Sequence, residues 1–320
     1  MATAAATTTQ AYEVIVIGGS FAGLSAAMQL ARARRRVCVV DAGQPRNRFA
    51  AASHGFFGQD GEPPLAMIEQ ARRKLAAYPT VVFVQGTVVS AMAQQRAGSP
   101  ENGFEVVLDD GTHMEAHKLV LAFGVQDGLP EIAGLRERWG ATVLHCPYCH
   151  GYEFAGQRLG VLYDSPGSAM HAQLIADWGP TTLFLNGDTT LESAERERLL
   201  ALGITIEPAP IVALEGPGQA LQGVHLQATG SGDARVVPLD ALYVAATTRP
   251  ASPLAEQLGC ALDDGPMGPY IRTDANTKMT TVPGVYAAGD LTLMRHNATL
   301  ASAEGVLAGV GAHQALVFGT

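Results

Sequence analysis

The feature that most constrains the fold is a glycine-rich turn between an apolar strand and a helix near the start of the chain. Residues 12–17 form a short apolar run that ends in Gly18-Gly19-Ser20-Phe21-Ala22-Gly23, and a helical pattern follows to about Ala33. The next apolar run, residues 36–40, ends in Asp41. Strand, glycine turn, helix, strand and acid in this order predict a dinucleotide-binding α/β fold, because the helix N-terminus can bind a pyrophosphate and the acid a ribose hydroxyl.

A weaker copy of the same unit follows in the middle of the chain. Its strand, helix and strand are expected at residues 158–162, 169–178 and 181–185. The positions of Gly18, Ser20 and Gly23 are taken here by Tyr163, Ser165 and Ser168. Tyrosine crowds a tight turn, Asn186 replaces the acid, and residues 186–190 hold no arginine for a 2′-phosphate. A shift of one residue brings Gly167 into the turn, so nucleotide binding here stays open.

The C-terminal part carries a second candidate ligand motif. Residues 281–290 read TVPGVYAAGD, so a short β segment places Asp290 directly after Gly289 at the end of a strand. Ligands of such sheets bind at the carboxyl ends of the strands. Residues 294–316 are expected to form a helix of small residues, whose N-terminal amides would face a flavin pyrimidine. The alternative for Asp290 is an ordinary helix N-cap.

The strongest chemical motif is Cys146-Pro147-Tyr148-Cys149-His150. Two thiols at this spacing close a small disulfide ring, and one thiolate can be stabilised by its neighbour, which lowers its pKa. His150 is the candidate base for thiols, because its unperturbed pKa lies near working pH. The alternative is that His150 only positions the redox turn. Zinc needs four ligands, and a single Cys pair predicts no metal site.

The composition limits the remaining possibilities. The formal charge is 21 − 30 = −9, which argues against nucleic acid or an anionic membrane as a partner. No run of about 18 apolar residues predicts a membrane span. Residues 1–10 lack the basic and apolar regions of a secretory signal and are expected to be a disordered tail of a cytoplasmic protein. Cys38 and Cys260 lie in an apolar strand and near a loop, and are expected to be structural.

Together these motifs resemble the low-molecular-weight thioredoxin reductases, within the pyridine nucleotide-disulfide oxidoreductases, from residue 13 to about 316. The resemblance implies an α/β fold of two Rossmann-like, three-layer domains, the second inserted in the first. A split FAD-binding domain is expected at residues 11–118 and 248–320, and an NADPH-domain-like insert that carries the CPYC motif at residues 119–247. FAD as cofactor and a homodimer are further implications of this resemblance.

The resemblance also assigns site residues. Cys149 matches the thiol next to the flavin, and Cys146 matches the thiol that exchanges with substrate. Residues 121–124 are similar to the segment that connects the two domains, with Phe123 as a departure. His54 is expected near the flavin or in loop packing, and His145 in a structural role. The family's FAD-binding positions fall on Gly18, Ser20, Phe21, Ala22, Gly23, Asp41, Arg46, Asn47, His54, Val88, Ala122, Gly124, Gly289, Asp290, Asn297 and Ala298.

Three departures from thioredoxin reductases guide the functional hypothesis: His150 in place of an acid, the altered second glycine loop, and the missing arginine cluster. The CPYCHGYE sequence is similar to the flavin-dependent dithiol oxidases of gliotoxin-, holomycin- and romidepsin-type pathways. We therefore expect a dithiol oxidase that passes electrons from a small dithiol through Cys146, Cys149 and FAD to oxygen, with NADP as a secondary acceptor. The alternatives are an NAD(P)H- or ferredoxin-dependent disulfide reductase and a redox-sensing flavoprotein with little turnover.

Overall fold

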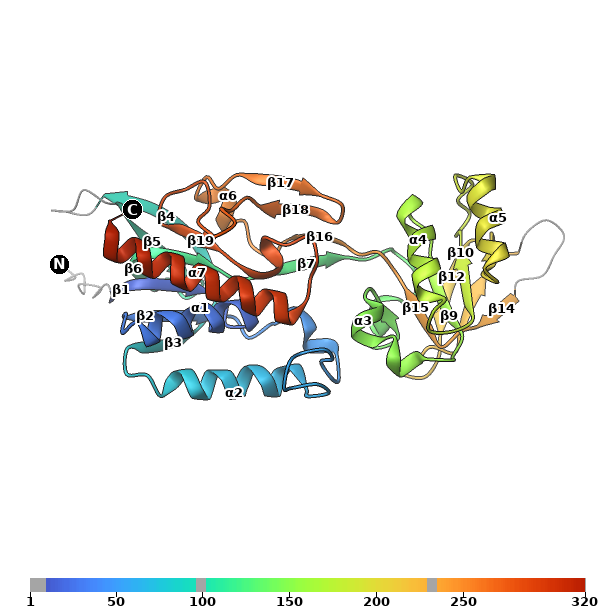
Figure 1. Cartoon of the computed structure of the whole chain (residues 1–320), viewed down its shortest axis with the longest axis horizontal. Coiled ribbons are helices and arrows are strands. Elements are labelled where there is room, and N and C mark those ends of the chain that lie inside the picture. Colours follow the sequence, from blue (N-terminus) through green and yellow to red (C-terminus); the bar gives the residue numbers. More distant parts are fainter. Residues whose placement is uncertain (1–9, 96–101, 229–234, 320) are drawn as a thin grey trace, which may run out of the picture. The chain divides into compact units, whose positions relative to one another are not determined.

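The computed structural model describes residues 10–95, 102–228 and 235–319, which form two compact units (Figure 1). Unit 1 contains the chain up to Arg48, Pro64–Gln126 and the chain from Thr248 onward, and unit 2 contains Phe49–Pro63 and Asp127–Thr247. The segment 119–126 therefore lies with unit 1 and not with the insert, and its first three residues end a strand of the unit 1 sheet, His113–Leu121. The tail expected over residues 1–10 lies outside the described residues up to residue 9, and a strand already begins at Gln10.

Unit 1 is built, over its described residues, on a sheet of seven strands in the order β3-β2-β1-β6-β5-β4, with β19 paired to the second half of β6. Its strands are β1 (Gln10–Ile17), β2 (Val37–Asp41), β3 (Val81–Gln85), β4 (Val88–Gln95), β5 (Asn102–Leu108), β6 (His113–Leu121) and β19 (Val285–Ala287). The strands β1, β2, β6 and β19 run parallel. Their carboxyl ends therefore meet at one edge of the sheet.

The helices of unit 1 cover this sheet. They are α1 (Phe21–Arg32), α2 (Pro64–Ala76), the short α6 (Leu254–Gln257) and α7 (Ala298–Phe318). Side chains along β1 alternate between two buried clusters: Val14 and Val16 pack with α1 and α7, and Ile15 and Ile17 pack on the other face. This period of two is expected of a strand that is buried on both faces. A hairpin of β17 (Leu262–Gly265) and β18 (Gly268–Ile271) completes the unit.

Helices α1 and α7 lie side by side at very close range (Figure 1). A Cβ atom on Gly305 would lie 2.0 Å from the carbonyl oxygen of Ala22, and one on Gly309 would lie 2.5 Å from that of Ala26. Only glycine allows this approach. The contact fixes α7 against the helix that follows the first glycine turn.

Unit 2 repeats the plan with a parallel sheet in the order β11-β10-β9-β15-β8, counted over its described residues. Its strands are β8 (Val143–Leu144), β9 (Leu159–Leu162), β10 (Thr181–Phe184), β11 (Thr205–Glu207) and β15 (Ala241–Tyr243). Its helices are α3 (Pro147–His150), α4 (Pro166–Ile175) and α5 (Ser193–Ala201). An antiparallel sheet adds β12 (Ile211–Glu215), β13 (Gly223–Leu226) and β14 (Arg235–Pro238).

The chain passes between the units at both ends of Phe49–Pro63, and again inside β7 (Val125–Gly128) and β16 (Thr247–Pro250), two strands that pair with each other. Two α/β units, the second inserted in the first, confirm the predicted fold class. Within the described residues, no helix is both long and apolar enough to cross a membrane.

Candidate functional site

The first glycine turn packs against the segment that follows β6. Gly18 has φ +110°, and a Cβ atom on it would lie 2.2 Å from the carbonyl oxygen of Ala122. A Cβ on Gly23 would lie 1.8 Å from the carbonyl oxygen of Gly18, so both positions require glycine. Ser20 is the N-cap of α1. The structure therefore brings together the turn, the start of α1 and the segment 121–124.

The predicted ribose-binding acid lies at the same turn. The backbone N–H of Gly19 donates to Oδ1 of Asp41 over 3.1 Å, and Nη1 of Arg72 lies 3.9 Å from Oδ2. The guanidinium of Arg72 is itself held over the ring of Phe83, 4.5 Å from its centroid. Asp41 is thus fixed beside the N-terminus of α1, where a dinucleotide ribose is bound in this kind of fold.

The C-terminal motif joins this site through an ion pair. Nη1 of Arg46 lies 2.9 Å from Oδ2 of Asp290, and both side chains are largely buried. Gly289 has φ +82°, and a Cβ atom on it would lie 2.9 Å from Cβ of Ala22. The structure therefore brings both predicted glycine motifs and Arg46 to one edge of the sheet. Asn47 lies in the same 3₁₀ turn as Arg46.

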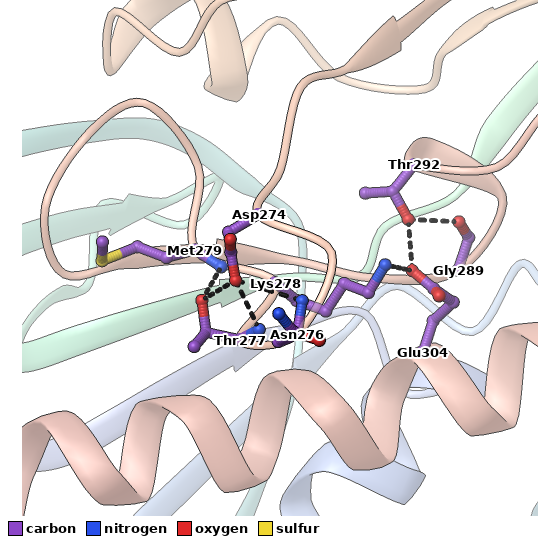
Figure 2. Close-up of polar contacts among 8 residues, drawn as sticks. All are labelled: Asp274, Asn276, Thr277, Lys278, Met279, Gly289, Thr292 and Glu304. Atoms are coloured by element: carbon purple, nitrogen blue, oxygen red, sulfur yellow. Dashed lines mark hydrogen bonds and ion pairs between the residues drawn. The ribbon is translucent and has the colours of Figure 1, made fainter.

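A buried network that sequence reasoning missed ties the Gly289 turn to α7 (Figure 2). Nζ of Lys278 lies 2.8 Å from Oε2 of Glu304, and both side chains are nearly inaccessible. The Thr292 hydroxyl lies 2.9 Å from the same Glu304 oxygen and 3.1 Å from the carbonyl oxygen of Gly289. Lys278 has φ +59° and follows a turn closed by Asp274. These residues come from separate segments, so no local pattern marks them.

The other predicted cofactor positions differ in their surroundings. Phe21 and Ala298 are the first residues of α1 and α7, and Gly124 has φ +74°. Oδ1 of Asn297 accepts from the N–H of Thr299 over 2.8 Å and so caps α7. The alternative of Asp290 as the helix cap is wrong, because α7 begins only at Ala298. Val88 is buried in the core of unit 1 at the start of β4.

The two redox cysteines lie at the start of α3 in unit 2. Cys146 is the N-cap, and the thiol of Cys149 donates to its sulfur over 2.7 Å. This hydrogen bond is the main cause that lowers the pKa of Cys146 to about 7, with help from the N–H groups of Cys149 and Tyr148 and against the effect of burial. In contrast, burial raises the pKa of Cys38 to about 12 and also raises that of Cys260. Cys146 therefore has the properties of a reactive thiol.

A group of ionisable side chains surrounds the end of α3. Burial lowers the pKa of His150, while the carboxylate of Glu153 raises it and His54 lowers it further. Nε2 of His54 lies 3.4 Å from Oε1 of Glu153, and its Nδ1 lies 3.6 Å from Oδ1 of Asp60. His54 thus lies beside the redox turn, and its predicted flavin contact stays a prediction. The ring of His145 packs 5.7 Å from that of Trp139, in keeping with a structural role.

The second glycine loop is filled by its own side chains. Oδ1 of Asp164 accepts from the hydroxyls of Ser165 over 3.0 Å and Ser168 over 2.7 Å. Pro166 is the first residue of α4, and proline has no N–H to offer a phosphate. Tyr163 is buried with its hydroxyl 3.3 Å from that of Thr190. The hydroxyl donors of Ser165 and Ser168 are therefore directed at a carboxylate of the same loop.

The residue in the acid position of the second unit is also used internally. Oδ1 of Asn186 accepts from the N–H of Ile211 over 2.8 Å, at the start of β12. Asn186 itself has φ +51°. This side chain links the turn after β10 to the first strand of the antiparallel sheet and does not provide a carboxylate for a ribose.

Comparison with known proteins identifies relatives over nearly the full chain. Residues 12–161 and 177–305 match the family described as pyridine nucleotide-disulphide oxidoreductase. Thioredoxin reductase tcpT of Claviceps purpurea is 31% identical, over 94% of this chain and 93% of the relative. An oxidoreductase from Agrobacterium tumefaciens has a similar structure, with a TM-score of 0.88, 43% identity and coverage of 97% of this chain and 100% of that one. The crystal structure of HlmI is also similar, with a TM-score of 0.87, 36% identity and coverage of 96% of this chain and 93% of that one.

The unmatched gap at residues 162–176 contains the second glycine loop and the whole of α4. The matched residues include the first glycine turn, the redox turn and the Gly289-Asp290 motif. The match spans most of the chain, and one curated relative exceeds 30% identity over nearly its whole length. The protein is therefore an oxidoreductase that belongs to the pyridine nucleotide-disulphide oxidoreductase family.

Proposed function

We propose that the protein is an FAD-dependent dithiol oxidase that forms an intramolecular disulfide in a small dithiol. Family membership implies FAD, and the residues of unit 1 fit it. The Gly18–Gly23 turn leads into the N-terminus of α1, whose N–H groups can bind a pyrophosphate, Asp41 is placed for a ribose hydroxyl, and Asp290 lies beside this turn. The redox residues would be Cys146 and Cys149.

FAD, when bound, accepts two electrons from the cysteine pair and passes them to oxygen, so that one dithiol and one O₂ become one disulfide and one H₂O₂. A substrate thiolate attacks Sγ of Cys146, and the bond to Cys149 breaks. The second substrate thiol then attacks the substrate sulfur and releases Cys146 as a thiolate. A pKa of about 7 makes Cys146 a good leaving group in this second step.

The proton of a substrate thiol needs an acceptor near the pair. His150 is the next residue after Cys149, and its lowered pKa keeps the imidazole neutral near pH 7. A neutral imidazole can take this proton. His150 would therefore act as the general base.

The observation that carries this proposal is the second glycine loop. The Asp164 carboxylate takes the hydroxyl donors of Ser165 and Ser168, at the place where a nicotinamide nucleotide would put its pyrophosphate. Two anions there would repel each other. We therefore expect the dithiol, and not NAD(P)H, to supply the electrons.

The second candidate is an NAD(P)H-dependent disulfide reductase. It is favoured by the curated relatives, because tcpT and sirT of Leptosphaeria maculans are both named thioredoxin reductases. In that reaction electrons would run from the nucleotide through FAD to the same cysteine pair. The two candidates therefore share the redox turn and differ only in the electron donor.

The test is anaerobic stopped-flow bleaching of the flavin by dithiols and by NADPH. Dithiothreitol, reduced gliotoxin and reduced holomycin would serve as dithiol probes. We expect a dithiol to bleach the flavin far faster than NADPH does, and air to restore its colour with release of peroxide. Rapid bleaching by sub-millimolar NADPH would establish the reductase instead. If oxygen fails and NADP⁺ restores the colour, NADP⁺ replaces oxygen as the acceptor.

A further inference from the structure

We propose that the buried network of Lys278, Glu304 and Thr292 positions the FAD. The network holds the Gly289–Asp290 turn in the conformation that binds the cofactor, and it thereby sets the affinity for FAD. The proposal rests on the FAD of the proposed function, which family membership implies, and it holds for either electron donor. All of these residues belong to unit 1, so the network lies within one compact body.

Hydrogen-bond distances connect the buried ion pair to the turn without a break (Figure 2). Nζ of Lys278 lies 2.8 Å from Oε2 of Glu304, and the Thr292 hydroxyl lies 2.9 Å from the same oxygen. That hydroxyl is also 3.1 Å from the carbonyl oxygen of Gly289, which accepts from the backbone N–H of Thr292 over 2.9 Å. The ion pair is therefore linked to the Gly289 turn through the Thr292 hydroxyl.

A second connection runs through the backbone. The carbonyl oxygen of Lys278 accepts over 3.0 Å from the N–H of Ala287, the last residue of β19. On the other side, Thr277 touches α7 so closely that a Cβ atom on Gly311 would lie 2.2 Å from its carbonyl oxygen. The segment that carries Lys278 is therefore fixed both to α7 and to the strand that leads into the Gly289 turn.

The Gly289 turn places two predicted cofactor residues. Gly289 has φ +82°, and a Cβ atom on it would lie 2.9 Å from Cβ of Ala22 in α1. Asp290 follows directly, and its Oδ2 lies 2.9 Å from Nη1 of Arg46. A displaced Gly289 would therefore change both the contact with α1 and the position of Asp290 at Arg46.

Two features of the network are unfavourable for stability, which points to a role other than folding. Lys278 has φ +59°, in the left-handed region that a residue with a Cβ atom rarely adopts. Its side chain and that of Glu304 are only 10% and 12% exposed. The loss of hydration of two buried charges offsets much of their attraction, so an apolar pair of similar volume is often equally stable. Local strain of this kind clusters where it fixes a functional conformation.

The expected effect on the cofactor follows from the population of the binding conformation. If the turn adopts this conformation only part of the time, the dissociation constant of FAD rises by the inverse of that fraction. Thr292→Val keeps the shape of the side chain and removes the hydroxyl that joins the pair to Gly289. Thr292→Ser keeps the hydroxyl. Glu304→Gln leaves the Lys278 ammonium without its counter-charge.

The experiment dilutes the full-length FAD-loaded protein and measures released FAD by its fluorescence. We expect the dissociation constant to rise about tenfold or more in Glu304→Gln and about fivefold in Thr292→Val, and to stay near the wild-type value in Thr292→Ser. The control is Glu13→Gln, which breaks the partly buried Glu13–Arg35 pair of 2.8 Å in the same unit. Glu13 lies in β1 four residues before its carboxyl end, away from both glycine motifs. This variant should lower the urea midpoint and leave the FAD affinity unchanged.

A second readout does not depend on how much cofactor is bound. At saturating FAD, hydrogen exchange of residues 285–296 should be faster in Glu304→Gln and Thr292→Val than in the wild type and Glu13→Gln. An unchanged FAD affinity in both variants, or an equal loss in Glu13→Gln, overturns the proposal, and so does a wild type that takes up no FAD. If dithiols fail to bleach the bound flavin, the proposed oxidase fails, while the FAD affinities still decide whether the network positions the cofactor.

Discussion

Cys146 shows how a small number of hydrogen bonds distinguishes cysteines within one chain. Its thiolate is stabilised first by the Cys149 thiol and then by two backbone N–H groups, which outweighs the penalty of burial. Cys38 and Cys260 are also buried, and burial dominates there and raises their pKa values. The spacing of two residues between Cys146 and Cys149 therefore sets the chemistry of the motif. It places the Cys149 thiol, a hydrogen-bond donor, next to the Cys146 sulfur that ionises.

This asymmetry predicts the pH dependence of alkylation. In the reduced protein, the rate of Cys146 alkylation by iodoacetamide should rise through about pH 7, because only the thiolate reacts and it forms above the pKa. Cys149→Ala removes the main donor and should move this rise to higher pH, whereas Cys149→Ser keeps a hydroxyl donor and should move it less. Mass spectrometry of the alkylated peptides measures both rates. Equal profiles for Cys149→Ala and the wild type would contradict the assigned cause.

At the scale of secondary structure, close contact between α1 and α7 organises unit 1. Gly305 and Gly309 let α7 touch the backbone of α1 at Ala22 and Ala26. The buried Lys278–Glu304 pair then connects the same helix to the Gly289 turn. Breaking a buried ion pair on one side leaves an uncompensated charge, which is costly. Helix α7 thus fixes the position of the Gly289 turn relative to α1, the helix that follows the first glycine turn.

Gly305→Ala should therefore destabilise the protein. The intrinsic helix propensity of alanine favours the change by about 1 kcal/mol, but the new methyl group would lie 2.0 Å from a backbone oxygen, and such overpacking costs about 1–3 kcal/mol or more. The control is Gly167→Ala in α4, where the nearest atom to a new Cβ is the Ser165 hydroxyl at 3.5 Å. Urea denaturation should show a lower midpoint for Gly305→Ala and an equal or higher one for Gly167→Ala. A raised midpoint for Gly305→Ala would contradict the close contact.

Local patterns predicted these elements better than they predicted the contacts between them. The first strand, helix and strand were expected from alternating and helical apolar positions, and their ends agree within about two residues. Helix α4 begins three residues before the expected start, because Pro166 suits the first helical turn. Helix α7 begins four residues later than expected, because Asn297 caps it. The His54–Glu153 and Lys278–Glu304 pairs join distant segments, and a sequence pattern carries no signal for such tertiary contacts.

In the molecule as a whole, the two predicted groups of site residues belong to different units. The first glycine turn, Arg46 and Asp290 belong to unit 1, and Cys146, Cys149 and His150 belong to unit 2. The second glycine loop also lies in unit 2, in the gap of the family match. The departures from the family therefore concentrate in the inserted unit, while unit 1 keeps both of its glycine motifs.

Asp164→Asn should increase the rate at which NADPH bleaches the flavin. The variant removes one negative charge from the loop, and a like-charge repulsion of about 1 kcal/mol corresponds to about a fivefold change in rate. The rate should still remain well below that with a dithiol, because Tyr163 and Pro166 are unchanged. Glu197→Gln on the exposed face of α5 is the control and should have no effect. An unchanged NADPH rate in Asp164→Asn would show that the carboxylate does not exclude the nucleotide.

A homodimer is expected, and α7 offers a surface for it. The helix exposes four apolar side chains at spacings of seven, three and seven residues: Leu300, Leu307, Val310 and Val317. Light scattering should give a mass of twice 33.4 kDa. Leu307→Glu should weaken the dimer, because it would bury a charge, and Leu200→Glu on α5 serves as the control. A monomeric wild type would contradict the predicted homodimer. A Leu307→Glu protein that stays dimeric would show that the interface does not include this face of α7.

The carboxylate in the second glycine loop also bears on how the inserted unit evolved. A loop of this kind can bind an anion through the donors at a helix N-terminus. Here Asp164 supplies the anion from within the chain, and Ser165 and Ser168 bind it. An ancestral lineage could thus lose the ligand without losing the fold. The inserted unit would still hold the CPYC turn, because these contacts within the loop need no bound nucleotide.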